Sequence, residues 1–287
     1  MRYNRYMNVL QSTKLFGWQW VVESKIQVIN FIDSYLANDI TDLLSISTAN
    51  PEQVVLAKQD DHFFQIVRDE FDLVLPDGEG IVLASRLLST QAKGIKIAER
   101  LAGVEIVAEL LSQSHPTHAP ILVIGGRGYQ DSKIKVDSGK FSFREVMNLT
   151  ELAVDSSNKH LFWLPAYEDA KHPTASEEAL VGSVIKRLRP KLVFVALGAP
   201  QQEFWVAEHK QLLNNAGVRI VMVVGGAFDM LTGKVSRAPE LLRQLKLEWL
   251  WRLIQEPSRW RRQLALVSFI FYVIWLKIGS YIERPKQ

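Results

Sequence analysis

The sequence contains no cysteine, which excludes disulfide bonds and thiolate metal sites and suits a reducing compartment. Long apolar runs are scarce too: the stretch Leu264–Leu276 has thirteen uncharged residues, whereas a bilayer-spanning helix takes about 20. The first ten residues, MRYNRYMNVL, carry charge but no apolar core, so we expect no signal peptide. With 287 residues, 47% of them hydrophobic, the chain can still bury a large core, which argues against wholesale disorder.

Several catalytic motifs are absent as well. The sequence has no Walker A pattern, no G-x-S-x-G elbow and no H-E-x-x-H pair. It also lacks a D-x-D pair of the kind that holds a metal ion on a diphosphate. We therefore expect no metal ion and no other cofactor, and we expect arginines to neutralise any diphosphate that the protein binds.

What the sequence does contain is a strand-turn-helix pattern around Asp77. The apolar run Leu73–Leu75 ends at Pro76-Asp77-Gly78, and a helix-like apolar segment, Ile81–Leu88, follows. Loops at the carboxyl ends of strands are where open α/β sheets bind ligands, so a carboxylate in this loop is a candidate for chemistry. By itself, Pro-Asp-Gly is also an ordinary turn sequence.

Unbroken apolar runs alternate with segments of helical period along most of the chain. The expected strands are a strand or hairpin within residues 7–22, then Leu43–Ser47, Leu73–Leu75, Ile121–Ile124, Leu161–Leu164, Leu192–Leu197 and Ile220–Val224. The expected helices are Ser24–Leu36, Glu52–Lys58, Asp60–Glu70, Ile81–Leu88, Gly103–Leu111, Ala175–Leu188 and Gln201–Leu213. This alternation predicts an α/β fold: a Rossmann-like, mostly parallel sheet with helices on both faces and a helical C-terminal appendage. Residues 129–160 show no clear pattern.

The composition changes at Arg237-Ala238-Pro239, so we place a sheet domain over residues 1–238 and a helical, basic and apolar appendage over residues 239–287. From Arg243 to Arg262 there are six Lys and Arg against two acids, an excess of four where the whole chain has a net charge of +3. This basic patch indicates an anionic partner: a lipid surface, nucleic acid or phosphate. Leu264–Leu276 is either a buried core or oligomer-interface helix, or a helix in the membrane interface, which the nearby tryptophans favour.

Five predicted strand ends carry loops suited to a ligand. Glycines there let backbone N–H groups approach an anion, and the helix N-termini that follow favour phosphate, so we expect a diphosphate-containing ligand. The loops are Thr48-Ala49-Asn50-Pro51, Pro76-Asp77-Gly78, Gly125-Gly126-Arg127-Gly128, Gly198-Ala199-Pro200-Gln201-Gln202-Glu203 and Gly225-Gly226-Ala227-Phe228-Asp229. The candidate cations, unless they form only a solvated face, are Arg100, Arg237, Arg252, Arg259 and Arg262.

Taken together, these segments resemble the WecG/TagA/CpsF family, glycosyltransferase family 26. The matching motifs occur in the family's order over roughly residues 45–262. Four of these motifs are the loops that begin at Thr48, Pro76, Gly198 and Gly225, and the second of them extends to Glu79-Gly80. The other motifs are Arg100 with Gly103, Arg237-Ala238-Pro239, Glu248-Trp249-Leu250-Trp251-Arg252-Leu253 and Glu256-Pro257-Ser258-Arg259.

The resemblance implies an inverting, metal-independent glycosyltransferase. Members of the family move a sugar, such as N-acetylmannosamine, its uronic acid or glucose, from a UDP donor to a sugar on a polyprenyl diphosphate. Their products are precursors of cell-surface polysaccharide or teichoic acid. The expected partners are therefore a UDP-sugar, the polyprenyl-diphosphate-linked glycan and the cytoplasmic face of the cell membrane, bound peripherally or monotopically through the C-terminal region. We expect no nucleic-acid partner and leave a homo-oligomer open.

The resemblance also assigns roles to individual residues. Asp77 is expected to be the general base that takes the proton of the acceptor hydroxyl. Arg252, Arg259 and Arg262 are expected to stabilise the leaving UDP. An inverting displacement needs such a base opposite the leaving group and positive charge where the diphosphate charge develops. The residues expected to bind substrate are Thr48, Asn50, Arg100, Gln202, Asp229 and Arg237.

Two other functions stay open at this point. A Rossmann-type nucleotide-binding oxidoreductase would need a complete G-x-G-x-x-G fingerprint, which is missing. A non-catalytic scaffold that the basic, apolar tail recruits to the membrane would lose its localisation on truncation after Gly233 and would show no turnover.

Overall fold

The computed structural model describes residues 10–38, 41–92, 96–112, 120–129, 132–136, 139–146, 160–245, 247–257 and 260–282. Within these residues, ten strands form one sheet in the order β1-β2-β4-β3-β10-β9-β5-β8-β7-β6. Neighbouring strands run parallel except at the two ends, where β1 with β2 and β6 with β7 form antiparallel pairs. The strands are β1 Ser12–Leu15, β2 Trp18–Val21, β3 Leu44–Ala49, β4 Leu73–Pro76, β5 Ile121–Gly125, β6 Lys133–Val136, β7 Gly139–Glu145, β8 His160–Leu164, β9 Leu192–Ala196 and β10 Ile220–Val223.

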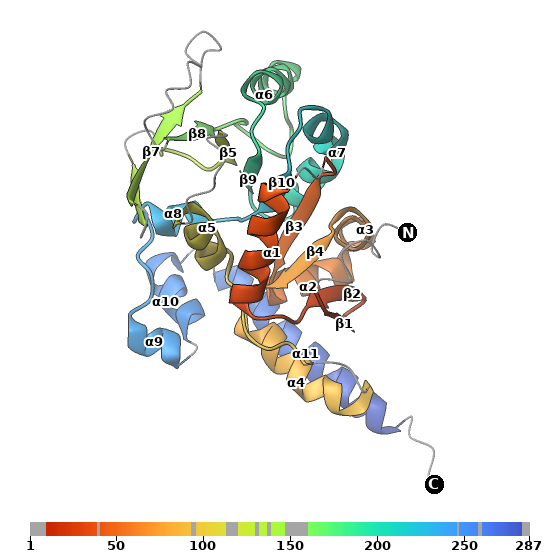
Figure 1. Cartoon of the computed structure of the whole chain (residues 1–287). Helices are drawn as coiled ribbons and strands as arrows, with labels where there is room; N and C mark the ends of the chain where they lie inside the picture. The colour runs from red at the N-terminus through yellow and green to blue at the C-terminus, as the bar shows by residue number, and fades with distance from the viewer. Residues whose placement is uncertain are drawn as a thin grey trace.

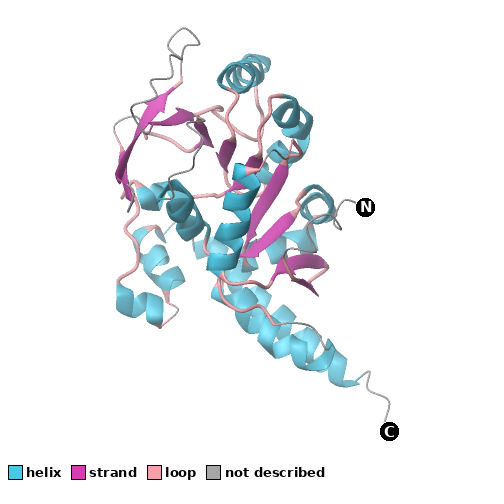
Figure 2. Cartoon of the chain, viewed as in Figure 1, coloured by secondary structure: helices cyan, strands magenta, loops and turns pink. Residues whose placement is uncertain are grey.

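Helices surround this sheet (Figures 1 and 2), and local sequence explains where several of them begin. Ser24, Asn50 and Thr174 each cap the helix that follows through a capping box, in which the cap and the third helical residue exchange hydrogen bonds. The helices are α1 Lys25–Ala37, α2 Pro51–Gln59, α3 Asp61–Glu70, α4 Glu79–Ala92, α5 Gly103–Ser112, α6 Ala175–Leu188, α7 Gln201–Asn215, α8 Ala227–Leu231, α9 Glu240–Gln244, α10 Glu248–Gln255 and α11 Trp260–Ile282. The predicted Rossmann-like α/β fold with a helical C-terminal appendage is confirmed.

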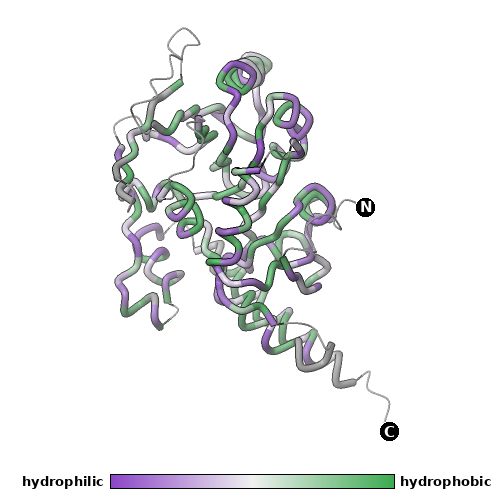
Figure 3. The backbone as a smooth tube through the Cα atoms, in the orientation of Figure 1, coloured by the Kyte–Doolittle hydropathy of each residue, from purple (hydrophilic) through white to green (hydrophobic). Residues whose placement is uncertain are grey.

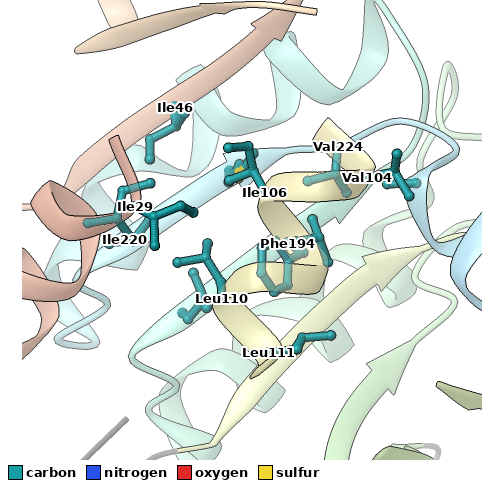
Figure 4. Close-up of a cluster of buried hydrophobic side chains, with 14 of the residues drawn as sticks. Ile29, Ile46, Val104, Ile106, Leu110, Leu111, Phe194, Ile220 and Val224 are labelled. Atoms are coloured by element: carbon teal, nitrogen blue, oxygen red, sulfur yellow. The ribbon is translucent and has the colours of Figure 1, made fainter. Parts of the chain in front are cut away.

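Alternate residues of the central strands enter two separate cores. In β9, Phe194 belongs to one core while Val193 and Val195 belong to the other, because side chains alternate along a strand. Ile29 of α1 and Leu110 of α5 cover the first face (Figure 4), and α6 and α7 cover the second. Both faces are buried, so the central strands β5, β9 and β10 are hydrophobic along their length (Figure 3).

The last helix, α11, runs beside α4 and contacts α2 (Figure 1). Phe269 and Val273 of α11 are buried in a third core together with Trp18 and Trp20 of β2. The appendage therefore shares a core with the sheet, and the position of the domain boundary stays a prediction. Throughout the described part of the chain, no helix combines the length and the apolar character that crossing a bilayer requires.

One pair of strands lies where the sequence showed no clear pattern. β6 and β7, within residues 133–145, pair with each other and extend the sheet beyond β8. Their apolar residues Ile134, Phe141 and Phe143 are buried and alternate with polar ones, as is typical of strands near a sheet edge. A search for unbroken apolar runs misses such strands.

Candidate active site

A cavity of about 560 Å³ lies at the carboxyl edge of the sheet. Its wall is formed by the loops that follow β3, β4, β9 and β10, by Arg100 and by residues of α10 and α11. From β4 the chain crosses to β5 on the other side of β3, β10 and β9, and such switch points are where α/β sheets bind ligands. Four of the five predicted loops line this cavity. The fifth, residues 125–128, does not, and its Arg127 donates to the Glu168 carbonyl at 2.6 Å instead.

Asp77 begins the loop after β4 and is held on two sides. Its backbone N–H donates to the Ala49 carbonyl at 2.8 Å, which fixes the loop against the end of β3. Its side chain is 26% exposed, accepts a hydrogen bond from the Gly103 N–H at 3.2 Å and lies 3.5 Å from Arg100 Nε. Burial raises the pKa of Asp77, while Arg100 and the Gly103 N–H oppose the rise. The result is an anchored carboxylate on the cavity wall.

Arg100 connects Asp77 to the C-terminal segment. Its Nη1 donates to Oε2 of Glu248, the first residue of α10, at 2.6 Å. Glu248 Oε1 lies 3.9 Å from Arg237 Nε, and Arg237 in turn pairs with Glu105. Burial acts to lower the pKa of Arg100, but the carboxylates of Asp77 and Glu248 outweigh burial and raise that pKa, so the guanidinium stays charged. Alternating charges thus extend from the cavity into the contact between α10 and the sheet domain.

The loop after β3 brings Thr48 and Asn50 to the cavity wall. Thr48 Oγ1 donates to the Val223 carbonyl at 3.0 Å and so ties β3 to β10. The Asn50 side chain accepts from the Gln53 N–H at 3.2 Å, and Gln53 Oε1 accepts from the Asn50 N–H at 3.0 Å. These contacts fix both side chains in place at the start of α2.

Gln202 and Glu203 begin α7 and bind three loops together. Gln202 Oε1 accepts from the Gly225 N–H at 3.0 Å, and its amide donates to Glu203 Oε1 at 2.9 Å. Glu203 is fully buried and also accepts from the Gln53 amide at 2.8 Å. Burial raises the pKa of Glu203 to about 7, although these hydrogen bonds act in the opposite direction. Gln202 therefore ties α7 to the loop after β10, and Glu203 ties α7 to α2.

Asp229 and Arg252 converge on the backbone at Gly226. A Cβ atom at Gly226 would lie 2.6 Å from Arg252 Nη2 and 3.3 Å from Asp229 Oδ2. The Tyr129 hydroxyl donates to Asp229 Oδ1 at 2.8 Å, and burial together with this carboxylate raises the pKa of Tyr129. Arg252 comes from α10, where its Nε lies 3.3 Å from Glu256. The missing side chain at position 226 gives the Arg252 guanidinium room to reach the cavity wall.

Of the three other predicted arginines, Arg237 alone has a described side chain. Arg237 does not line the cavity and lies between Glu105 and Glu248. Arg259 falls outside the described residues, and Arg262 belongs to α11 but its side chain is not among those described. The roles predicted for all three stay predictions. Arg100 and Arg252 are the arginines that the described structure brings to the cavity wall.

Some residues of the site had no predicted role. Glu203 and Glu248 were parts of recognised motifs, but their partners Gln53 and Arg100 lie 150 and 148 positions away in the sequence. Tyr129 begins the stretch without a clear pattern. In the described part of the chain, no group of three or more His, Asp or Glu side chains is arranged to hold a metal ion. The expectation that the reaction needs no metal stays a prediction.

This arrangement suits the transfer of a group from a phosphorylated donor. An anchored carboxylate can accept the proton of an attacking hydroxyl group, and guanidinium groups can stabilise the negative charge of a leaving phosphate. A Rossmann-like sheet with these groups at its carboxyl edge therefore places the protein in the class of group-transfer enzymes. Comparison with known proteins narrows this class to one family. A sequence profile of the glycosyl transferase WecG/TagA/CpsF family matches residues 14–282, and the chain belongs to that family.

The resemblance inferred from the motifs is thereby confirmed, and the chain is a glycosyltransferase. Three relatives share the name N-acetylglucosaminyldiphosphoundecaprenol N-acetyl-beta-D-mannosaminyltransferase. The protein from Bacillus subtilis (strain 168) is 30% identical over 241 residues, which cover 84% of this chain and 83% of the relative. That from Bacillus spizizenii is 28% identical over 259 residues, covering 87% and 90%. That from Staphylococcus aureus (strain MW2) is 25% identical over 263 residues, covering 91% of each. Family membership favours the transferase over the scaffold and the oxidoreductase.

Proposed function

We propose that this glycosyltransferase moves an N-acetylmannosaminyl group from a UDP donor to N-acetylglucosamine on a polyprenyl diphosphate. The shared name of the relatives supports the transferred sugar and the acceptor. The observation that carries the mechanism is that Asp77 and Arg252, from distant parts of the chain, line the same cavity. The product would be a precursor of a cell-surface polysaccharide or teichoic acid.

In the proposed reaction, Asp77 takes the proton of the acceptor hydroxyl group. The hydroxyl oxygen forms a bond to the anomeric carbon of the donor sugar, and the bond from that carbon to UDP breaks on the opposite face. One such displacement inverts the anomeric centre, so a donor α-linked to UDP gives a β-linked product, in keeping with the relatives' name. The anchoring of Asp77 by the Ala49 carbonyl and the Gly103 N–H supports this role, because a base must be held in line with its proton.

Positive charge is needed where UDP leaves. We assign Arg252 to the diphosphate because its Nη2 reaches the glycine loop after β10, whereas Arg100 is paired with Asp77, the proposed base, and with Glu248. Guanidinium groups form bidentate hydrogen bonds with phosphate, so we propose that arginines take the place of a metal ion. Arg259 and Arg262 are further candidates for the same role.

The acceptor carries a lipid chain, and we propose that the C-terminal region holds the enzyme on the cytoplasmic face of the membrane. α11 is about 34 Å long at 1.5 Å per residue, and one of its faces is apolar and exposed. The exposed apolar residues of α11 are Trp260, Leu264, Val267, Ile270, Phe271, Ile274, Trp275 and Ile278. Leu83 and Leu87 of the neighbouring α4 are exposed as well. A helix of this kind lies in the membrane interface with its apolar face toward the acyl chains.

The direct test offers the purified full-length chain a panel of UDP-sugars and N-acetylglucosamine linked to a polyprenyl diphosphate. Mass spectrometry is expected to show one added N-acetylhexosamine with UDP-N-acetylmannosamine, at a rate that a metal chelator does not change. Transfer of a different sugar in preference would overturn the donor assignment, and no transfer from any UDP-sugar would overturn the function.

Asp77→Asn keeps the size of the side chain and removes the base. We expect kcat to fall about 100-fold or more, the usual contribution of a positioned general base. Asp69→Asn, at an exposed carboxylate of α3, is the control and is expected to keep the parental rate. Transfer at the parental rate by Asp77→Asn would show that another group is the base.

A further inference from the structure

Glu248 is an acid of the C-terminal segment that reaches the catalytic side of the sheet domain. It is the first residue of α10, lines the same cavity as Asp77, and its side chain is 13% exposed. Its carboxylate meets Arg100, the same guanidinium that faces Asp77. One cation is therefore shared by the proposed base and by an acid from the appendage.

The sharing is unequal. Arg100 Nη1 donates to Glu248 Oε2 at 2.6 Å, whereas Arg100 Nε lies 3.5 Å from Asp77 Oδ1 and has no hydrogen-bond partner among the described residues. An arginine and a carboxylate without competing partners frequently form two parallel hydrogen bonds, which engage both carboxylate oxygens. Arg100 does not make this pair with Asp77: its short hydrogen bond goes to Glu248 through Nη1, while its Nε stays 3.5 Å from Asp77.

We propose that Glu248 is a positioning residue: its charge competes with Asp77 for the Arg100 guanidinium and so keeps the Asp77 carboxylate available for the acceptor proton. The inference rests on the proposed role of Asp77 as the base. It assigns to the C-terminal segment a part in proton transfer, in addition to the binding of the leaving group.

The charges around the two acids support this reading. Asp77 faces Arg100 and the Gly103 N–H, and Glu248 faces Arg100 and, at 3.9 Å, Arg237. Beyond them, Glu105 is shared by Arg237 and by Lys25 at 3.3 Å. Burial raises the pKa of Asp77, Arg100 lowers it, and the charge of Glu248 raises it again. Without the charge of Glu248, the pKa of Asp77 would be lower, and Asp77 would be a weaker base.

The test is Glu248→Gln, which keeps an oxygen to accept from Arg100 and removes the charge. The acid limb of the kcat/KM profile is expected to move to lower pH by about 0.5–1 unit, since Asp77 stays ionised further into acid. At the plateau, kcat is expected to fall about 3- to 10-fold because a weaker base accepts the proton less readily, while KM for the UDP-sugar changes less than about twofold. Glu248→Asp, which keeps the charge, is expected to leave the acid limb in place.

Glu240→Gln removes the same charge from the exposed start of α9 and is the matched control, expected to leave the profile unchanged. A loss of kcat in Glu248→Gln with an unmoved acid limb would overturn the proposal, since a purely structural role lowers the rate equally at all pH values. Titration of ¹³Cγ-labelled aspartate by NMR, with Asp77→Asn to assign the signal, measures the same shift without turnover. If the parental chain transfers no sugar, the proposed function fails, and this titration still decides whether Glu248 acts on Asp77.

Discussion

At the residue scale, Glu203 is a fully buried carboxyl group with an incomplete set of hydrogen bonds. Its Oε1 accepts two amide hydrogen bonds, from Gln53 and Gln202, while its Oε2 has no hydrogen-bond partner among the described residues. Burial raises its pKa to about 7, well above the value of about 4.3 for an exposed glutamate. The folded state therefore binds a proton that the unfolded state releases between these two pH values, and the free energy of unfolding falls as the pH rises through that window.

Glu203→Gln removes this titration and keeps the size of the side chain. The change in the free energy of unfolding on substitution, variant minus parental chain, is expected to be more favourable at pH 8 than at pH 5 by about 1–3 kcal/mol. The reason is that the variant has no buried group to ionise. Denaturant unfolding at both pH values measures this difference. Glu208→Gln, at an exposed position of the same helix, should show no such pH dependence. An equal effect of Glu203→Gln at both pH values would mean that Glu203 is not protonated in the folded state.

At the element scale, α11 has two faces with different partners. Phe269 is 2% exposed and meets Phe16 edge to face, with ring centroids 5.4 Å apart. Phe271, two residues on, is 67% exposed. Because 3.6 residues make one turn, residues two apart lie on nearly opposite sides of a helix. The inner face thus belongs to the core of the sheet domain, and the outer face is available for another surface.

The same substitution at these two positions separates the faces. Phe269→Ala is expected to lower the free energy of unfolding by about 3–5 kcal/mol, through lost burial and the cavity that it leaves. Phe271→Ala is expected to change it by less than about 0.5 kcal/mol. Denaturant unfolding of both variants in detergent-free buffer is the measurement. Equal small effects would contradict the packing of α11 on β2 and α2.

At the scale of the whole molecule, α4 and α11 leave the body side by side (Figure 1). The cavity lies near the beginning of both helices. Gly80 at the start of α4 and Leu266 of α11 line that cavity. An enzyme resting on the membrane through these helices would therefore hold its active site next to the bilayer surface. A lipid-linked acceptor could then reach Asp77 while its chain stays in the membrane.

Replacement of Phe271 and Trp275 by serine tests this arrangement. Each residue buries apolar area worth about 1.5–3 kcal/mol, so the double variant is expected to bind anionic vesicles at least about tenfold more weakly. Sedimentation with vesicles measures the binding. Leucine at both positions keeps the apolar surface and is expected to keep the binding. Unchanged sedimentation of the serine variant, together with a loss of dimers on gel filtration, would assign this face to a second copy of the chain instead.

The sequence by itself indicated the parallel strands of the sheet, the helices between them and the edge on which the chemistry lies. Apolar runs such as Leu192–Ala196 and capping residues such as Asn50 act over a few positions, and parallel strands bring their carboxyl ends to one edge wherever they stand in the sheet. The place of Asp77 at a strand end therefore made it a candidate, and the family resemblance supplied its expected role. The hairpin β6–β7 could not, because an edge strand needs no unbroken apolar run.

Only the tertiary structure decided which charges meet. Arg100 and Glu248 are 148 positions apart, and no local pattern links a guanidinium in one loop to the first residue of a distant helix. Likewise, Arg252 and Arg237 were both candidate cations in the sequence, yet the structure brings the first to the cavity wall and leaves the second between two acids. Periodicity is a local property of the chain, whereas the pairing of charges depends on how whole elements pack against each other.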